Sequence, residues 1–117
     1  MATTYVLLFS GGRMPEGEDE VRQVMGAWEN WLGKYHDNVP DAGNPFTPAA
    51  KAIRPDGSVA DAPSGGPSGY TLVKADSLDQ AVEIARSCPV LLGGASISVY
   101  ETFDAMGAMT GAGQHQH

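Results

Sequence analysis

Apolar and polar positions alternate between strand-like and helix-like patterns along the chain. The first pattern is a short apolar run, Tyr5–Phe9, which stops at Ser10-Gly11-Gly12 and is typical of a buried strand. Pro15 and the acidic residues that follow it suit the first turn of a helix. We expect that helix to end near His36, with its apolar positions on one face: Val21, Val24, Met25, Trp28, Leu32 and Tyr35.

The middle of the chain is rich in Pro and Gly and predicts loops with a short hairpin. Residues 37–50 form a loop around one large apolar residue, Phe46. Residues 49–53 and 58–62 flank the turn dipeptide Asp56-Gly57, which predicts two short paired strands. Residues 63–69 are expected to form a mobile loop.

A strand, a helix and a last strand complete the pattern. Tyr70–Ala75 predicts a strand, and Ser77 with Gln80 predicts a capping box for a second helix, which Cys88-Pro89 ends. Ser96–Thr102 is the last predicted strand. We expect one domain over residues 1–105 and a flexible tail over residues 106–117, because the tail has no apolar period.

This order of elements predicts an α+β fold of the ferredoxin-like, split βαβ type. In such a fold both helices cover one face of an antiparallel sheet. The strand Tyr5–Phe9 carries apolar side chains on both of its faces, so the second face of the sheet also needs a cover. A homodimer joined sheet to sheet is the simplest cover and is therefore our expectation.

Composition narrows the classes of partner and site. The 117 residues carry a formal net charge of −7, which argues against binding nucleic acid or an anionic membrane surface. The single cysteine, Cys88, excludes an internal disulfide, and with three histidines it predicts no metal site; we also expect no cofactor. The N-terminus resembles no export signal and no apolar stretch is long enough to span a membrane, so we expect a cytoplasmic protein.

Four stretches of the sequence together carry a resemblance to a known family. They are Tyr5–Phe9 with Gly11-Gly12, residues 25–31 (Met-Gly-Ala-Trp-Glu-Asn-Trp), Gly69-Tyr70 leading into residues 75–82, and residues 85–89 leading to Gly93-Gly94. Over residues 4–103 the chain resembles the YCII-related family, in the branch known for an Asp-Gly-Pro-Phe motif. The resemblance implies a ferredoxin-like fold and a dimer of the dimeric α/β barrel type.

The resemblance implies several activities, none of which transfers residue by residue. Some members resemble muconolactone isomerases or act as dehydrochlorinases, with a His on the first helix and an Asp before a Pro as the acid/base pair. Other members accompany alternative sigma factors. This chain has Trp28 near the position of that His, Cys88 in place of that Asp, and Asp61-Ala62-Pro63-Ser64 where the name motif is expected. The family's enzyme chemistry is therefore not carried over.

The sequence offers five candidate ligand-binding residues: Trp28, His36, Phe46, Asp61 and Tyr70. In this hypothesis the two apolar rings line a cavity between the first helix and the sheet, Asp61 or Tyr70 orients the ligand, and residues 63–69 form a lid. Plainer alternatives exist for three of them. Trp28 fills the core, His36 stabilises the helix end, and Asp61 serves a turn.

Two functions are compatible with these patterns. One is a binding or regulatory protein without identifiable catalysis, which holds a small apolar or aromatic-acid ligand or a transcription-factor partner. The alternative is an isomerase- or lyase-like enzyme in which Asp61, His36 or Tyr70 moves a proton. An enzyme should show titratable groups converging in one pocket. A binding protein should show an apolar cavity with one or two polar anchors.

Overall fold

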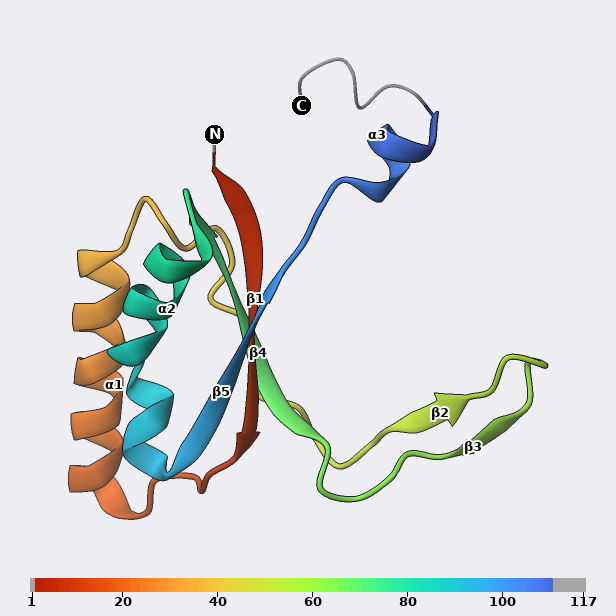
Figure 1. Cartoon of the computed structure of the whole chain (residues 1–117). Coiled ribbons are helices and arrows are strands. Elements are labelled where there is room, and N and C mark those ends of the chain that lie inside the picture. Colours follow the sequence, from red (N-terminus) through yellow and green to blue (C-terminus); the bar gives the residue numbers. More distant parts are fainter. Residues whose placement is uncertain (1, 111–117) are drawn as a thin grey trace.

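A three-stranded antiparallel sheet forms the centre of the molecule (Figure 1). The computed structural model describes residues 2–110. β1 (Thr3–Gly11) lies between β4 (Pro67–Ala75) and β5 (Ala95–Glu101), and Leu7 faces Thr71 on one side and Val99 on the other. The first apolar run of the sequence is thus the central strand of the sheet.

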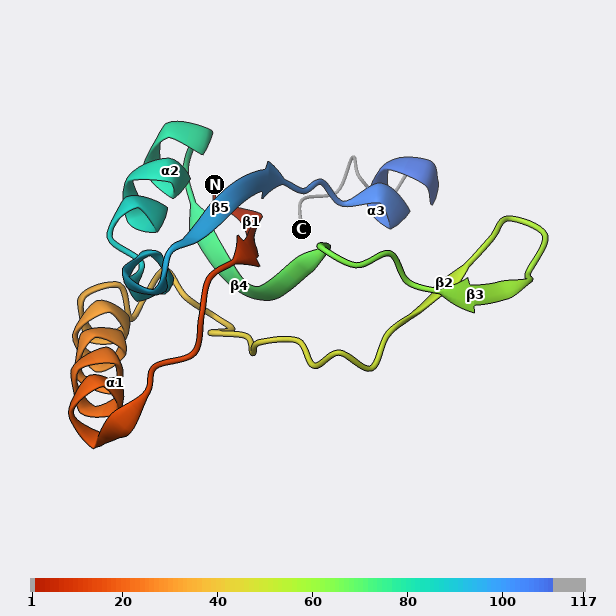
Figure 2. The same cartoon turned by 90° about the horizontal axis from the view of Figure 1, so that it is seen from below.

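Two helices and a short 3₁₀ helix cover one face of this sheet (Figures 1 and 2). They are α1 (Gly17–Lys34), α2 (Leu78–Arg86) and the 3₁₀ helix η1 (Pro89–Gly93). The buried core lies on this side: Tyr5, Leu7, Phe9, Trp31, Val73, Ala75, Ala81, Ile84, Ala85 and Cys88. The α+β fold with both predicted helices on one face is confirmed.

The predicted inward face of α1 is confirmed in part, because Trp28, Leu32 and Tyr35 pack against the core. The buried residue of α1 is Trp31, with Trp28 partly buried beside it, whereas two of the predicted inward positions, Val21 and Met25, are exposed. The reason is that α1 packs mainly against η1 rather than directly against the sheet. The side of the helix that meets the α2–η1 junction therefore becomes the buried side.

α2 begins and ends where the sequence predicts. The Ser77 hydroxyl accepts a hydrogen bond from the Gln80 backbone N–H at 3.1 Å, and the Gln80 side chain reaches back to the Asp76 N–H at 2.6 Å. Pro89 cannot continue an α-helix, because it lacks an N–H group. The chain turns there into η1 and then enters β5.

Residues 38–46 lie along the outer edge of β4 and take the place of a fourth strand. Backbone hydrogen bonds join Leu72 N to Asp41 O at 2.9 Å and Lys74 N to Asn38 O at 2.6 Å. Gly43 lies in this segment at φ +71°, and a Cβ atom there would come within 1.8 Å of a backbone oxygen of β4. This close approach therefore requires glycine.

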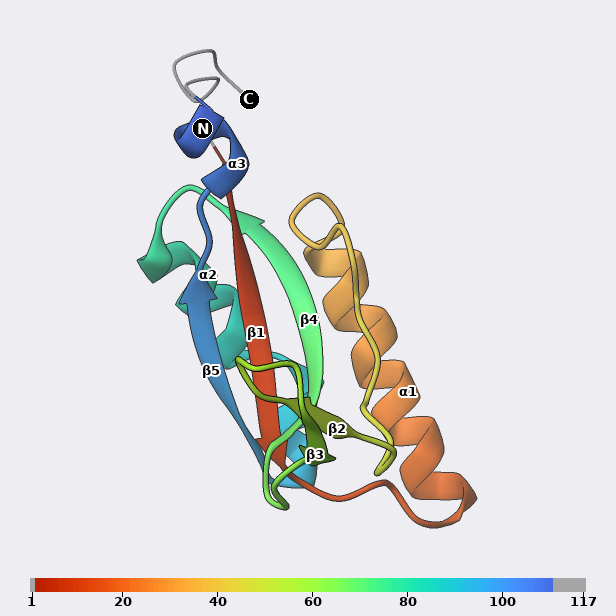
Figure 3. The same ribbon diagram turned by 90° about the vertical axis from the view of Figure 1, so that its right-hand side faces the viewer.

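The predicted hairpin forms, but it stands apart from the main sheet. β2 (Lys51–Ile53) and β3 (Val59–Asp61) make a separate two-stranded sheet that projects from the face opposite the helices (Figures 1 and 3). The expected loop over residues 63–69 is wrong at its C-terminal end, because β4 begins at Pro67, which pairs with Ser10. Of the lid expected over residues 63–69, only residues 63–66 lie outside β4.

A short helix, α3 (Ala105–Thr110), follows β5 at a place where the sequence predicts no regular structure. The Asp104 side chain accepts a hydrogen bond from the Gly107 N–H at 2.9 Å, as a helix-capping residue does. The rest of the expected tail, residues 111–117, lies outside the described residues. None of the helices within residues 2–110 combines the length and the apolar character needed to cross a membrane.

Candidate functional site

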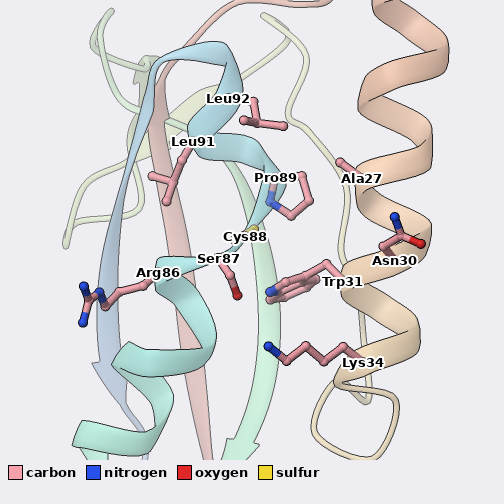
Figure 4. A pocket seen from close by; sticks show the side chains of 10 residues that line it. All are labelled: Ala27, Asn30, Trp31, Lys34, Arg86, Ser87, Cys88, Pro89, Leu91 and Leu92. Atoms are coloured by element: carbon pink, nitrogen blue, oxygen red, sulfur yellow. The ribbon is translucent and has the colours of Figure 1, made fainter.

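A cleft of about 420 Å³ opens between α1 and the α2–η1 junction (Figure 4). Its volume lies within the range of small-molecule sites, roughly 300–1,000 Å³. None of its lining residues is an acid or a histidine, and most of the lining is apolar: Ala27, Asn30, Trp31, Lys34, Arg86, Ser87, Cys88, Pro89, Leu91 and Leu92. The cleft therefore suits an apolar ligand better than a cationic one.

Trp31 lies at the base of the cleft and ties α1 to α2. Its indole Nε1–H donates a hydrogen bond to the Ile84 carbonyl at 3.1 Å. Its ring packs edge-on against Trp28 and Tyr35, with ring centroids 5.6 and 5.8 Å apart. Because the indole N–H already has a partner, the ring is held in place, and with only 4% of the residue exposed it forms the buried base of the cleft.

Lys34 is the cation whose charged end reaches into the cleft. Figure 4 shows its side chain running beside Trp31 toward the α2–η1 junction. Arg86 also lines the cleft, but its guanidinium extends away from it and pairs with Glu83 at 2.8 Å. The hydroxyl of Ser87 on the far side adds a hydrogen-bonding group. A ligand anion would therefore meet the Lys34 ammonium first.

Cys88 contributes apolar volume to the cleft rather than a nucleophile. The side chain is buried, and this burial raises the pKa of the thiol to about 11. A thiol with that pKa stays protonated at neutral pH, and the thiolate is the reactive form. Covalent chemistry at this residue is therefore not supported.

A second group of side chains lies on the sheet face that points away from the helices. Phe46 stacks on Tyr70 with the ring centroids 5.9 Å apart, and the Tyr70 hydroxyl donates a hydrogen bond to the Asp41 carboxylate at 3.3 Å. Tyr70 alternates along β4 with the buried Thr71 and therefore points to the open face. A hydroxyl beside a carboxylate can exchange a proton with a bound molecule.

The structure brings only two of the five predicted residues together, namely Phe46 and Tyr70. Trp28 lies on the helix side, against Trp31. His36 is exposed at the end of α1, where its ring lies 3.2 Å from the side chain of the next residue, an aspartate. Asp61 is exposed on the hairpin. None of the five lines the cleft, and their roles in ligand binding stay predictions.

Asp61 has a local partner instead. Its carboxylate pairs with the Lys51 ammonium at 2.9 Å across the two strands of the hairpin. Within residues 2–110, no group of three or more His, Cys, Asp or Glu side chains is placed to hold a metal ion. Neither Trp31 nor Lys34 is among the five residues that the sequence analysis selects. Their spacing of three positions on one helix was the available signal, since such residues are neighbours on the helix surface.

The comparisons with known proteins bear on the fold. No family model matches the sequence, and no curated protein matches it. The structure is similar to that of the 5-chloro-2-hydroxyhydroquinone dehydrochlorinase TftG from Burkholderia phenoliruptrix, in complex with 2,5-dihydroxybenzoquinone. The TM-score is 0.51 at 15% identity, over 87% of this chain and 96% of that one. The chain therefore has an α+β fold like that of this dehydrochlorinase.

At this identity the likeness to the dehydrochlorinase shows the fold alone. A second solved structure, of an unknown protein from Galdieria sulphuraria, aligns with a TM-score of 0.41 at 12% identity, over 90% of this chain and 47% of that one.

Proposed function

We propose that this protein binds a small, mainly apolar ligand with a carboxylate group in the cleft beside Trp31, without catalysing a reaction, and that it works as a homodimer. The observation that carries the proposal is the combination of an apolar lining with one inward-reaching cation, Lys34. The resemblance of residues 4–103 supports placing the protein in the YCII-related family.

The apolar part of the ligand would lie mainly against Leu91 and Leu92, which are exposed beside the buried Trp31. Pro89 and Leu92 line the same cleft from η1. A flat aromatic ring fits such a surface, because aromatic faces stack on one another and on apolar side chains. An aromatic acid is therefore the class of ligand that we propose.

The carboxylate of the ligand would meet the Lys34 ammonium. The chain as a whole carries a net charge of −7 and repels anions at long range. Because no acidic residue lines the cleft, the Lys34 ammonium can still attract an anion there despite the net negative charge of the chain. A hydrogen bond between two charged groups is also stronger than one between neutral groups, so this contact would provide much of the selectivity.

The test measures the binding of benzoic, salicylic and 2-naphthoic acids and of their neutral amides by calorimetry and by Trp fluorescence. We expect saturable binding of at least one acid, and a loss of at least about tenfold in its affinity in Lys34→Met, since a hydrogen bond to a charged group contributes about 1.5–3 kcal/mol. The affinity of the amide should change little. Lys74→Met on β4 is the matched control. Equal losses in both variants, or no saturable binding, would contradict the proposal.

A homodimer is compatible with this site. The open face of the sheet carries half-buried apolar residues of β1, among them Val6 and Leu8, and Tyr100 of β5 is exposed opposite Val6. A second copy that covers this face would leave the cleft free, because the cleft lies on the helix side. Ligand binding and dimerisation can therefore be tested separately.

An isomerase- or lyase-like enzyme is the second candidate, and two observations favour it. The fold is shared with a dehydrochlorinase, and Tyr70 hydrogen-bonds Asp41 on the open sheet face. In a dehydrochlorination a base removes a proton from the substrate and chloride leaves with the electron pair of the C–Cl bond. The carboxylate of Asp41, acting through the Tyr70 hydroxyl, would be that base.

Chloride release from 5-chloro-2-hydroxyhydroquinone tests the enzyme candidate. If the chain is such an enzyme, chloride should appear faster than in buffer, and Tyr70→Phe should reduce the rate at least a hundredfold, as the loss of an acid–base group does. Lys34→Met should leave the rate unchanged. A rate no higher than in buffer would remove this candidate and leave the binding proposal standing.

A further inference from the structure

The β2–β3 hairpin is a regular element that stands apart from the other described helices and strands. Its two strands pair with each other, and within residues 2–110 no extended contact joins either strand to another helix or strand. Figures 1 and 2 show it reaching away from the sheet on the side opposite the helices. A two-stranded hairpin alone is at best marginally stable in water.

The turn of the hairpin is nevertheless closed by several hydrogen bonds. The Asp56 carboxylate accepts from the Ser58 N–H at 2.9 Å, and the Gly57 N–H donates to the Arg54 carbonyl at 2.8 Å. The Ser58 hydrogen bonds lower the pKa of Asp56, so the carboxylate is held in its charged form. This hairpin is therefore preformed before it meets a partner.

The preformed hairpin exposes two β-branched side chains. Ile53 and Val59 face each other directly across the strands, and they are 73% and 62% exposed. Cross-strand pairs of this kind stabilise a sheet when they are covered. A rigid arm that presents an apolar pair to water is typical of an element that packs against another chain.

Two observations fit a second copy of this chain as the partner. The open face of the sheet carries the half-buried Val6 and Leu8 of β1 and the exposed Tyr100 of β5, which a second copy would cover. Residues 51–61 carry two cations and two acids, so this arm can approach a second acidic chain without net repulsion.

The shape of the protomer indicates where the arm lies on the second copy. The hairpin and the β5–α3 segment project from the same side of the sheet, at its opposite ends (Figure 1). A two-fold axis that runs across the strands and brings two open faces together then places each hairpin beside the β5–α3 segment of the other copy. That segment exposes Phe103 and Met109, each 80% exposed.

From these observations we infer that the β2–β3 hairpin is an exchanged arm, whose Ile53–Val59 pair packs against Phe103 and α3 of a second copy. This inference rests on the homodimer of the proposed function. It adds to that dimer a contact between the hairpin of one copy and the β5–α3 segment of the other. Loss of the arm should weaken the dimer without affecting the ligand cleft, which lies on the far side of the sheet.

Mixed cross-linking tests the contact directly. One preparation carries Val59→Cys and the other carries Phe103→Cys, and the buried Cys88 is left in place. After mixing and mild oxidation we expect a disulfide-linked dimer that contains one chain of each kind, in excess over either self-linked dimer. Val59→Cys mixed with Met14→Cys is the control, because Met14 is exposed near the start of α1. Equal cross-linking in both mixtures would overturn the inference.

Sedimentation of hairpin variants separates the arm from the dimer itself. Ile53→Asp should raise the dimer dissociation constant at least tenfold, and Met14→Asp should not, while circular dichroism confirms that both variants fold. If the unaltered protein is dimeric and the Ile53→Asp dimer dissociates no more readily than the unaltered one, the inference about the arm is wrong. The proposed homodimer would not be affected by that result. If the unaltered protein is monomeric at 100 µM, the homodimer fails and the arm fails with it.

Discussion

Gly43 is the residue on which the outer edge of the sheet depends. It lies at φ +71°, and a Cβ atom would approach a backbone oxygen of Tyr70 to 1.8 Å. We predict that Gly43→Ala lowers the free energy of unfolding by about 2 kcal/mol or more. Left-handed backbone at a residue other than glycine costs about 1–3 kcal/mol, and the clash adds to that cost. Urea unfolding followed by circular dichroism measures the change.

Gly33 provides the matched control for this substitution. It lies within α1, and a Cβ atom there would meet nothing within 4 Å. Gly33→Ala should therefore stabilise the protein by up to about 1 kcal/mol, because alanine restricts the unfolded chain and fits the helix. Equal effects of the two substitutions would mean that residues 38–46 do not lie against β4 as described.

The thiol of Cys88 should react only when the protein unfolds. Burial raises its pKa to about 11, so at pH 8 almost no thiolate is present and a reagent cannot reach the sulfur. We predict that Ellman's reagent labels the native protein no faster than the protein unfolds, and that it labels the urea-unfolded protein at once. Complete labelling of the native protein within seconds would show that the cleft opens to the thiol.

At the scale of elements, a salt bridge holds the loop after β1 to the first turn of α1. Arg13 donates to the Glu20 carboxylate at 2.6 Å, and this hydrogen bond, with a weaker one from the Glu16 N–H, lowers the pKa of Glu20 below its usual value of 4.5. A carboxylate with a lowered pKa stabilises the folded state above its unfolded pKa. It loses that contribution as the pH falls through the folded pKa.

Arg13→Gln should therefore lower the melting temperature at pH 7, and the difference from the unaltered protein should shrink as the pH falls below 4.5. Lys74→Gln changes the net charge by the same amount and is the control for general charge effects. A difference that stays constant from pH 7 to pH 3 would mean that the salt bridge contributes nothing to folding.

Local sequence signals predicted the elements because each signal acts within a few residues. The capping pair Ser77–Gln80, the stop at Pro89 and the turn at Asp56-Gly57 all occur where expected. The buried side of α1 was predicted only in part, because Trp31 lies outside the set of apolar positions that the sequence places on one face. Only the position of η1 decides that Trp31, rather than Met25, is buried.

At the scale of the whole molecule, the candidate site depends on contacts between segments that are far apart in the sequence, and local patterns do not predict such contacts. The cleft joins α1 to Pro89, Leu91 and Leu92, which lie at or beyond the predicted end of the second helix. Conversely, the predicted grouping of Trp28 with Phe46 failed to form, because the helices and the segment 38–46 lie at different parts of the sheet. The contact of Phe46 with Tyr70 followed from the predicted loop and strand.

The open face of the sheet allows the oligomeric state to be tested. Tyr100 on β5 lies on the open sheet face, opposite Val6, and is 54% exposed. We predict that the unaltered protein sediments at twice 12.2 kDa at micromolar concentration, and that Tyr100→Lys shifts it toward the monomer, since two copies would then bury like charges together. Met14→Lys, at an exposed site near α1, should leave the dimer intact.

The central position of β1 has a consequence for how the chain folds. The strand is the first to leave the ribosome, yet Thr3 pairs with Ala75 and Tyr5 pairs with Glu101. Its partners are thus synthesised only after most of the chain, and the sheet is dominated by contacts of large sequence separation. Loop-closure entropy opposes such contacts until late, so folding should take milliseconds to seconds rather than microseconds. During synthesis the apolar segment Tyr5–Phe9 is exposed until its partner strands have been made. It is therefore the segment to which we expect a chaperone to bind.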